Sequence, residues 1–479
     1  MTTQQTTHTS DSKVFMQDIF EQQKHAFLSH PYPQKKERKE MLRALKKSLL
    51  KNKARLLKCL SADYSHRSDD DSLIADILPS VMTINHTLSH LKQWMKPEKR
   101  RVSMVFQPAK AWIEHQPLGV VGIIVPWNYP IYLTIGPLVA AIAAGNRVMI
   151  KLSEFTPYTN RILREVLEEV FDQTEVAVIE GNADIAASFS ALAFDHLLFT
   201  GSTQVGKHVM RAAANNLTPV TLELGGKSPV FIGQDAPMEL AVERMLYGKC
   251  LNAGQTCVAP DYVLCPQDKV ATLIELIDNR FKSLYPSLDD NPDYSAMINE
   301  SQYGRLKAWL SEAESAGCDI IELNPAGESF TPSSRKIPLT LVVNPPEHIN
   351  LSQQEIFGPV LPIVAYETEH DAIRYIQNRP RPLALYLMSF NSRLQKQVLS
   401  LTHSGGVCIN DSISHVVQDD LPFGGVGHSG MGHYHGKEGF LTFSKTKAIF
   451  KKGRFNSAKL AFPPYGRWIH KLIYKLYLR

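Results

Sequence analysis

The chain has 479 residues, of which 44% are hydrophobic and 21% are charged, and its formal net charge is +5. This composition excludes a disordered, fibrous or membrane-embedded protein, and the length predicts two or three structural units. Because the net charge is small for this length, it gives no reason to expect nucleic acid as a partner.

The cysteines and the N-terminus bear on the cellular compartment. Six cysteines are too few for a disulfide framework and none has metal-ligand spacing, so we predict a protein of the reducing cytoplasm without a metal. The polar N-terminus lacks the basic and apolar regions of a secretory signal, and we expect residues 1–14 to be a disordered tail. The sequence has no run of about 18 apolar residues, the rough minimum for crossing a bilayer.

The segment 35–65 carries hydrophobic residues at helical spacing with lysines and arginines between them. This pattern predicts an amphipathic helix, and its basic residues are typical of a solvated face rather than of a nucleic-acid site. Residues 100–116 alternate like a β-hairpin, and the Gly-rich stretch from Gly405 onward is a candidate to pair with it.

Five short apolar runs after Pro117 alternate with stretches of helical length, which predicts βαβ units and a parallel sheet. Nucleotide cofactors bind at the carboxyl ends of such strands. A second series of strand and helix signals begins near residue 228, and we place a domain boundary at Gly225 and Gly226. The five predicted strands lie in VGIIVP, RVMIKLS, VAVIEGN, HLLFTGS and PVTLELGG.

Seven motifs follow one another along the chain: VPWNYP (125–130), IKLSEFTP (150–157), FTGSTQVGK (199–207), LELGGKSP (222–229), GQTCVAPDYVL (254–264), EIFGPV (355–360) and PFGGVGHSGMG (422–432). In this order they resemble the aldehyde dehydrogenase superfamily, and the resemblance spans roughly residues 15–450. GQTCVAPDYVL is similar to the class 3 branch, and FPPYGR near the C-terminus is similar to the coniferyl aldehyde dehydrogenase group.

The resemblance implies an α/β protein with the aldehyde dehydrogenase fold, assembled as a homodimer. Its expected parts are a Rossmann-like NAD(P)-binding domain (15–94 and 118–224), an α/β catalytic domain (225–404), a small β oligomerisation or bridging element (95–117 and 405–450) and a basic amphipathic tail (451–479).

The motifs also contain residues that suit aldehyde oxidation. Hydride can leave only from a tetrahedral carbon that bears O⁻, so a nucleophile must add first and a donor must stabilise the oxyanion. Cys257 is the candidate nucleophile, because the Gly, Gln and Thr before it are not typical of a core strand. The candidate donors are the side chain of Asn128, at the end of a predicted strand, and the backbone N–H of Cys257.

The thioester left after hydride loss needs a base that activates water, and Glu223 is the candidate. It ends a predicted strand 34 positions before Cys257, and the glycines after it let the backbone bend toward the thiol. Partial burial is expected to raise its pKa toward neutrality, as a general base requires. Without the motifs, the default interpretations are a buried apolar cysteine, a turn asparagine and a surface carboxylate.

The resemblance further implies residues that hold the cofactor, which is NAD, with NADP as an alternative. Lys151 and Glu154 are expected to bond the adenosine ribose, and Glu154 favours NAD because a carboxylate repels a 2′-phosphate. Gly201, Ser202 and Gly206 open a strand-to-helix turn that favours the pyrophosphate. The remaining expected contacts are Glu355 and Phe357 for the nicotinamide ribose and ring, and Tyr129 and Phe423 for the aldehyde substrate.

The C-terminal sequence RWIHKLIYKLYLR predicts a basic amphipathic helix. Arg467, Lys471, Lys475 and Arg479 recur every four residues beside an apolar stripe. Such a helix docks on its own or a partner subunit, which we favour, or makes a peripheral contact with an anionic membrane.

These patterns predict oxidation of an aldehyde to its carboxylic acid through a thioester on Cys257. The candidate substrates are aromatic aldehydes such as coniferyl aldehyde, and medium- or long-chain aliphatic aldehydes. Two alternatives stay open: an acylating or reductive dehydrogenase that forms the same thioester, against which Glu223 argues, and a non-catalytic NAD-binding structural protein.

Overall fold

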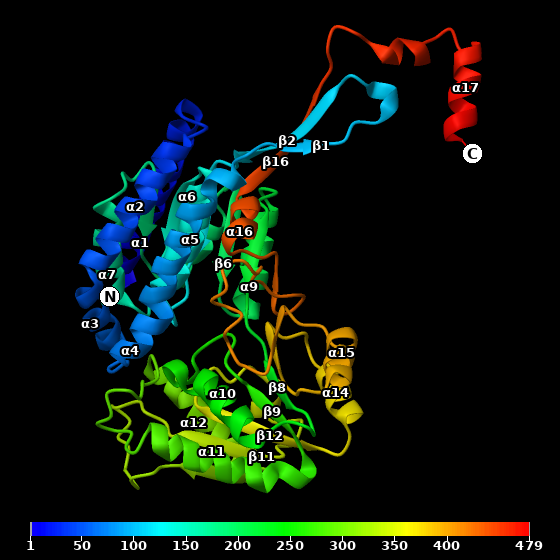
Figure 1. Ribbon diagram of the computed structural model, residues 1–479. Helices are drawn as coiled ribbons and strands as arrows, with labels where there is room; N and C mark the ends of the chain where they lie inside the picture. The colour runs from blue at the N-terminus through cyan, green and yellow to red at the C-terminus, as the bar shows by residue number, and fades with distance from the viewer. Residues whose placement is uncertain (1, 479) are drawn as a thin grey trace.

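The computed structural model describes the backbone of residues 2–478 and the side chains of residues 13–104 and 106–478. Three β-sheets lie in the described part of the chain, and the two larger ones are mostly parallel. Helices pack beside both of the larger sheets, as Figure 1 shows. The predicted α/β class is therefore confirmed.

Helices form the N-terminal part of the fold and pack beside the helices of the first large sheet (Figure 1). The prediction of one helix over 35–65 is wrong, because the helix is interrupted at Asn52, whose φ and ψ are −93° and 4°. Residues 2–14, expected as a disordered tail, are helical in the structure. The first helix begins at Thr2 and its later turns bury Met16, Ile19 and Phe20 in the core. The helices are α1 (Thr2–Ser29), α2 (Lys35–Lys51), α3 (Lys53–Asp63), α4 (Asp69–Ser72), the π-helical turn η1 (Leu73–Ile77) and α5 (Leu78–Trp94).

The first large sheet has the strand order β15-β7-β6-β3-β4-β5, and only β15 runs antiparallel among the described strands. Each of the five apolar runs predicted as strands belongs to it, because Val, Ile, Leu and Phe fill both buried faces. Its elements are β3 (Val120–Ile124), α6 (Tyr132–Ala144), β4 (Arg147–Lys151), α7 (Pro157–Glu168), β5 (Val176–Ile179), α8 (Ala183–Ser190), β6 (His196–Thr200), α9 (Thr203–Ala214), β7 (Val220–Glu223) and β15 (Gly430–Met431).

The chain passes to the second large sheet directly after Gly225 and Gly226, and the strand order there is β10-β11-β12-β9-β8-β13-β14. Although β14 lies beyond residue 404, it pairs with β13 of this sheet, so residues 406–409 are not part of a separate bridging element. The elements are β8 (Pro229–Ile232), α10 (Met238–Cys250), η3 (Leu251–Gly254), β9 (Tyr262–Pro266), η4 (Gln267–Lys269), α11 (Val270–Leu284), α12 (Glu300–Ser315), β10 (Asp319–Leu323), β11 (Leu339–Val343), α13 (Asn350–Gln353), β12 (Val360–Tyr366), α14 (Glu369–Gln377), β13 (Ala384–Met388), α15 (Ser392–Leu401) and β14 (Gly406–Ile409).

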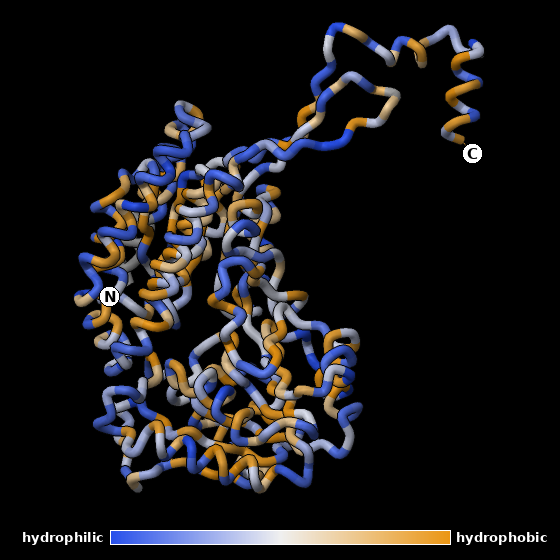
Figure 2. Tube along the Cα trace, viewed as in Figure 1, coloured by the Kyte–Doolittle hydropathy of each residue, from blue (hydrophilic) through white to orange (hydrophobic). Residues whose placement is uncertain are grey.

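The third sheet, of order β1-β2-β16, leads away from the body of the molecule, and the C-terminal helix lies at the far end of this arm (Figure 1). It contains the predicted hairpin. Figure 2 shows hydrophobic and hydrophilic residues interspersed along the arm. Arg479 of the predicted tail helix lies outside the described residues. In the described part of the chain, no helix has the length and apolar character needed to cross a membrane. The elements of the arm are β1 (Glu98–Arg100), η2 (Met104–Phe106), β2 (Lys110–Pro117), β16 (Ser444–Lys451), η5 (Ser457–Ala461) and α17 (Trp468–Tyr477). The short helix α16 (Gly436–Thr442) precedes β16 and packs on α5 and α6 in the body of the molecule.

Candidate active site

A strained turn carries Cys257. After α10 ends, Asn252, Ala253 and Gly254 all have positive φ values, of 52°, 52° and 74°. A Cβ on Gly254 would lie 2.6 Å from the carbonyl oxygen of Gly358, so the turn requires glycine there. Residues held in sparsely populated backbone regions cluster at functional sites, and this turn is followed by a partly buried thiol.

Two cavities meet at this thiol. The first, which we call the thiol cavity, has a volume of about 220 Å³ and is lined by six of the predicted site residues besides Cys257: Asn128, Gly201, Ser202, Glu223, Glu355 and Phe357. The second, which we call the aromatic cavity, has a volume of about 300 Å³ and is lined by Tyr129 and Phe423, the predicted substrate contacts. Among the described residues, Cys257 alone lines both cavities.

Glu223 is a buried carboxyl group at the end of β7. Neither of its side-chain oxygens has a hydrogen-bond partner among the described residues, and burial raises its pKa well above the ordinary value of 4.5. Burial, with the nearby Glu355 and Glu223 carboxyl groups, raises the pKa of the Cys257 thiol to about 12. When this carboxyl group is ionised, its raised pKa makes it a stronger base, able to take a proton from the thiol or from a water molecule.

Asn128 lies beside the thiol-bearing turn. Its side-chain Nδ2 donates a hydrogen bond to the carbonyl oxygen of Gln255 over 3.2 Å. The neighbouring Tyr129 hydroxyl lies 2.5 Å from Oγ1 of Thr256. The end of β3 and the thiol turn are therefore joined by side-chain hydrogen bonds, and the second N–H of the Asn128 amide is left to donate elsewhere.

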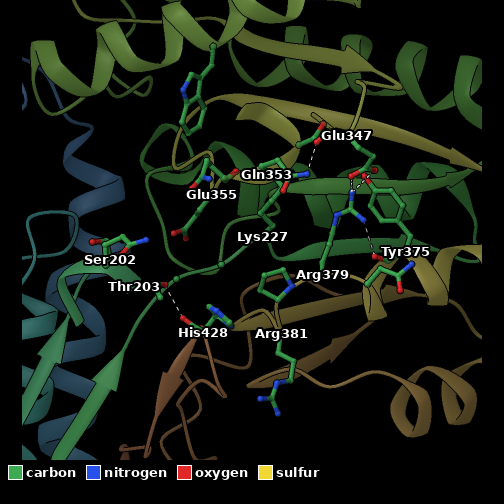
Figure 3. A pocket seen from close by; sticks show the side chains of 18 of the residues that line it. Ser202, Thr203, Lys227, Glu347, Gln353, Glu355, Tyr375, Arg379, Arg381 and His428 are labelled. Carbon is green, nitrogen blue, oxygen red and sulfur yellow. Dashed lines mark hydrogen bonds and ion pairs between the residues drawn. The ribbon is translucent and has the colours of Figure 1, made fainter. Parts of the chain in front are cut away.

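A larger cleft of about 890 Å³ opens beside the thiol cavity (Figure 3), between the first turns of α9 and residues of α12, α13 and α14. Ser202, Gly225 and Glu355 line both, so the cleft and the thiol cavity adjoin. The Ser202 side chain accepts a hydrogen bond from the N–H of Val205 and caps α9. Such a helix N-terminus at the carboxyl end of a parallel sheet suits a nucleotide phosphate.

Glu355 lines both the cleft, where Figure 3 shows it, and the thiol cavity. Burial and the negative charge of Asp261 raise its pKa to about 8, and its Oε1 has no hydrogen-bond partner among the described residues. A Cβ on Gly225 would lie 2.1 Å from its Oε2, so a larger residue there would push the Glu355 carboxyl aside. An unpaired buried carboxyl of this kind fits an acceptor for ribose hydroxyl groups.

Three predicted cofactor residues, Lys151, Glu154 and Gly206, do not line the thiol cavity or the cleft. Lys151 and Glu154 form an ion pair of 3.8 Å after β4, the strand that pairs with β3. Gly206 packs in the first turns of α9, where a Cβ would lie 2.7 Å from Leu224 Cδ2. The structure thus gives Gly206 a packing role between α9 and the segment after β7.

Several lining residues were missed in the sequence. Trp127 lines the thiol cavity and contacts Phe357 edge-to-face, with ring centroids 5.3 Å apart. Because it belongs to the VPWNYP motif, that motif could have indicated it as a site residue. Arg305 has no such signal, since it lies on α12 far along the chain and reaches the site by donating to the carbonyl oxygen of Ile356 over 2.7 Å. In the aromatic cavity, the missed residues include Tyr132, Tyr434 and His435.

Comparison with known proteins agrees with this geometry. A model of the aldehyde dehydrogenase family matches residues 4–449. A Pseudomonas aeruginosa relative named probable coniferyl aldehyde dehydrogenase is 52% identical over 464 residues, covering 97% of this chain and 96% of the relative. A substrate-bound structure of Staphylococcus aureus AldH has a TM-score of 0.91 at 36% identity and covers 97% of this chain and 99% of that one. A Mycobacterium tuberculosis aldehyde dehydrogenase solved with NAD+ has a TM-score of 0.82 at 25% identity, with 92% and 91% covered.

These matches extend over nearly the whole chain, and they coincide with a thiol, a carboxyl and an amide gathered around one cavity beside a nucleotide-sized cleft. The chain therefore belongs to the aldehyde dehydrogenase family and oxidises aldehydes with NAD(P) as the cofactor.

Proposed function

We propose that the substrate is an aromatic aldehyde of the coniferyl type. The observation that carries this proposal is the wall of the aromatic cavity, where the rings of Phe423 and His435 stack with centroids 5.1 Å apart and an interplanar angle of 15°. Tyr129, Tyr132 and Tyr434 add further ring surface. Because flat rings pack well against one another, such a cavity favours a planar substrate, and the name of the Pseudomonas aeruginosa relative supports the same class.

The first chemical step is addition of the thiol to the aldehyde. Glu223 takes the proton of Cys257, and the thiolate sulfur bonds to the carbonyl carbon to form a thiohemiacetal oxyanion. The backbone N–H of Cys257 and the free N–H of the Asn128 amide donate to that oxygen. Loss of one such donor typically costs on the order of 3 kcal/mol in the transition state.

The second stage removes hydride and releases the acid. NAD, when bound, would supply the hydride acceptor, and loss of hydride from the carbon would leave a thioester on Cys257. Glu223, after releasing its first proton to solvent, takes a proton from a water molecule that attacks the thioester carbon. The carbon–sulfur bond then breaks, which frees the carboxylic acid and restores Cys257.

We propose that several residues outside the reacting centre hold the cofactor. Glu355 and Phe357 hold the nicotinamide ribose and ring, and Gly201 and Ser202 hold the pyrophosphate at the N-terminus of α9. Lys151 and Glu154 bond the adenosine ribose, with Glu154 favouring NAD over NADP.

We also propose a homodimer in the cytoplasm, with the C-terminal tail docked on protein and a peripheral membrane contact as the alternative. The support is the arm, where Phe455, Tyr465 and Trp468 are exposed by 67%, 70% and 74%, more than a monomer favours for large rings. The cysteines are all unpaired, in agreement with a reducing compartment.

A panel of initial rates tests the substrate class. Coniferyl aldehyde and cinnamaldehyde are compared with a linear alkanal of the same carbon number as cinnamaldehyde, with NAD and with NADP. We expect kcat/KM to be at least about tenfold higher for the aromatic aldehydes, since a planar ring fills the aromatic cavity better. Equal or higher kcat/KM for the alkanal would contradict the proposed class while leaving the thioester chemistry untouched.

A further inference from the structure

A buried ion pair lies behind the end of β3. The side chains of Arg67 and Asp76 are both fully buried, and Nη2 of Arg67 lies 3.0 Å from Oδ2 of Asp76. Arg67 follows α3 and Asp76 lies in η1, so both come from the N-terminal helices. Burying two charges is expensive, so the pair by itself is weak evidence for a gain in stability.

The guanidinium of Arg67 also holds the backbone of Asn128. Its Nη1 donates to the carbonyl oxygen of Asn128 over 2.7 Å. The same oxygen accepts from Nδ2 of Asn252 at 3.2 Å and from the hydroxyl of Tyr64 at 3.3 Å. The bond from Arg67 is the shortest of these and the donor is charged, so it is the strongest restraint on that peptide.

Asp76 restrains the following residues. Its Oδ1 accepts hydrogen bonds from the N–H groups of Ile131, at 3.1 Å, and Tyr132, at 2.9 Å. Between these anchors, the ring of Tyr129 lies 4.9 Å from the Arg67 guanidinium. The pair therefore holds the segment from Asn128 to Tyr132 at both ends.

We propose that Arg67 positions the Asn128 amide for catalysis. The proposal rests on the proposed role of Asn128 as a donor to the oxyanion. Arg67 lines neither the thiol cavity nor the aromatic cavity, so it acts through Asn128 and does not touch the reacting atoms. A misplacement of about 1 Å in such a donor costs on the order of a hundredfold in rate. Lysine keeps the charge but lacks the planar fork that reaches both the Asn128 carbonyl and Asp76.

A double-mutant cycle on the full chain tests this proposal. It compares kcat and KM for the parent, Arg67→Lys, Asn128→Ala and the double variant. We expect Arg67→Lys to lower kcat about tenfold or more with little change in the KM for NAD, and to lower it by less than about twofold in the Asn128→Ala background. A purely structural role predicts the same fold-loss in both backgrounds, and that result overturns the proposal.

Arg38→Lys is the matched control. Arg38 is a buried arginine of the same helical layer that donates to the carbonyl oxygen of Ala143 over 2.7 Å, away from the thiol turn. We expect Arg38→Lys to change kcat by the same factor in the parent and in the Asn128→Ala background. If Arg67→Lys does not fold, Tyr64→Phe removes another donor to the Asn128 carbonyl without touching the ion pair. Its loss of kcat must likewise disappear in the Asn128→Ala background, or the proposal is wrong.

The cycle separates this proposal from the function on which it rests. Full activity of Asn128→Ala would contradict the oxyanion role of that residue and, with it, the role of Arg67. A low activity of Asn128→Ala with independent, multiplying losses for Arg67→Lys would keep the proposed function and reject the positioning role alone.

Discussion

Three ionisable groups around the thiol cavity are all held toward their neutral forms. The pKa values of Glu223, Glu355 and Cys257 are all raised, chiefly by burial, and for Cys257 also by the charges of the other two. Among the residues that the structure describes, none forms an ion pair with Glu223, Glu355 or Cys257. The site therefore favours neutral acids, and ionisation is costly until a substrate or cofactor group shares the charge.

The raised pKa of Glu223 predicts how the stability of the protein changes with pH. The folded-state pKa of Glu223 lies above its ordinary value of 4.5, so ionisation opposes folding: the cost is absent below about pH 4.5 and grows as the pH rises toward the folded-state pKa. Glu223→Gln is expected to melt higher than the parent at pH 8.5, by about 2 °C or more, with a smaller difference at pH 5.5. Thermal melts at both pH values measure this.

Glu168→Gln, on the exposed face of α7, is the matched control and should change the melting temperature little at either pH. Equal melting temperatures for the parent and Glu223→Gln at pH 8.5 would show that Glu223 is not held as an unpaired buried acid.

At the scale of elements, the site is assembled from the ends of strands and from one irregular turn. β3 delivers Asn128 and β7 delivers Glu223 at the same edge of a parallel sheet, whereas the left-handed residues 252–254 deliver Cys257 from the other domain. The backbone strain of this turn is offset by its packing against Gly358 and by the hydrogen bonds of the Gln255 side chain.

Two glycine substitutions test the turn. Gly254→Ala places a Cβ 2.6 Å from the carbonyl oxygen of Gly358 at a φ of 74°, so we expect a loss of about 1–3 kcal/mol in the free energy of unfolding and a lower kcat. Gly304→Ala is the control, because no atom lies within 4 Å of the added Cβ in the exposed part of α12. There we expect a gain of about 0.5–1 kcal/mol. Chemical denaturation measures both, and a neutral Gly254→Ala would contradict the strained turn.

The sequence predicted the helices and strands better than it predicted contacts between elements that lie far apart along the chain. The apolar runs from VGIIVP to PVTLELGG are strands because a buried parallel sheet needs continuous apolar residues. The break at Asn52 escaped prediction because the apolar spacing continues across it. Motifs indicated the residues that now surround the thiol cavity. Arg67 and Arg305 carried no local pattern, because their contacts arise only when elements far apart in the chain pack together.

At the scale of the whole molecule, the arm is more basic than the rest of the chain. From Ser444 onward the sequence contains ten lysines and arginines and no acidic residue, although the whole chain has a net charge of only +5. The same segment exposes Phe455, Tyr465 and Trp468. A surface both basic and apolar at the end of an extended sheet suits a docking element, and the more acidic remainder of a second chain offers complementary charge.

Light scattering tests the docking. We expect the full chain to have twice the monomer mass of 53.7 kDa, and a variant that ends at Lys451 to form a weaker dimer, since the exposed rings are then missing. A monomeric full chain would contradict the dimer. Co-sedimentation of the full chain, but not of the shortened variant, with phosphatidylglycerol vesicles would show instead that the tail contacts the membrane.

The most direct test of the thioester mechanism is mass spectrometry of Glu223→Gln quenched during reaction with aldehyde and NAD. Because this variant lacks the base for both stages, we expect NADH to form slowly and to stop at about one per site, with an acyl group left on the peptide that contains Cys257. Cys257→Ser in the same background should show neither. Absence of the adduct on Cys257 despite NADH formation, or full-rate acid production by Cys257→Ser, would contradict the account.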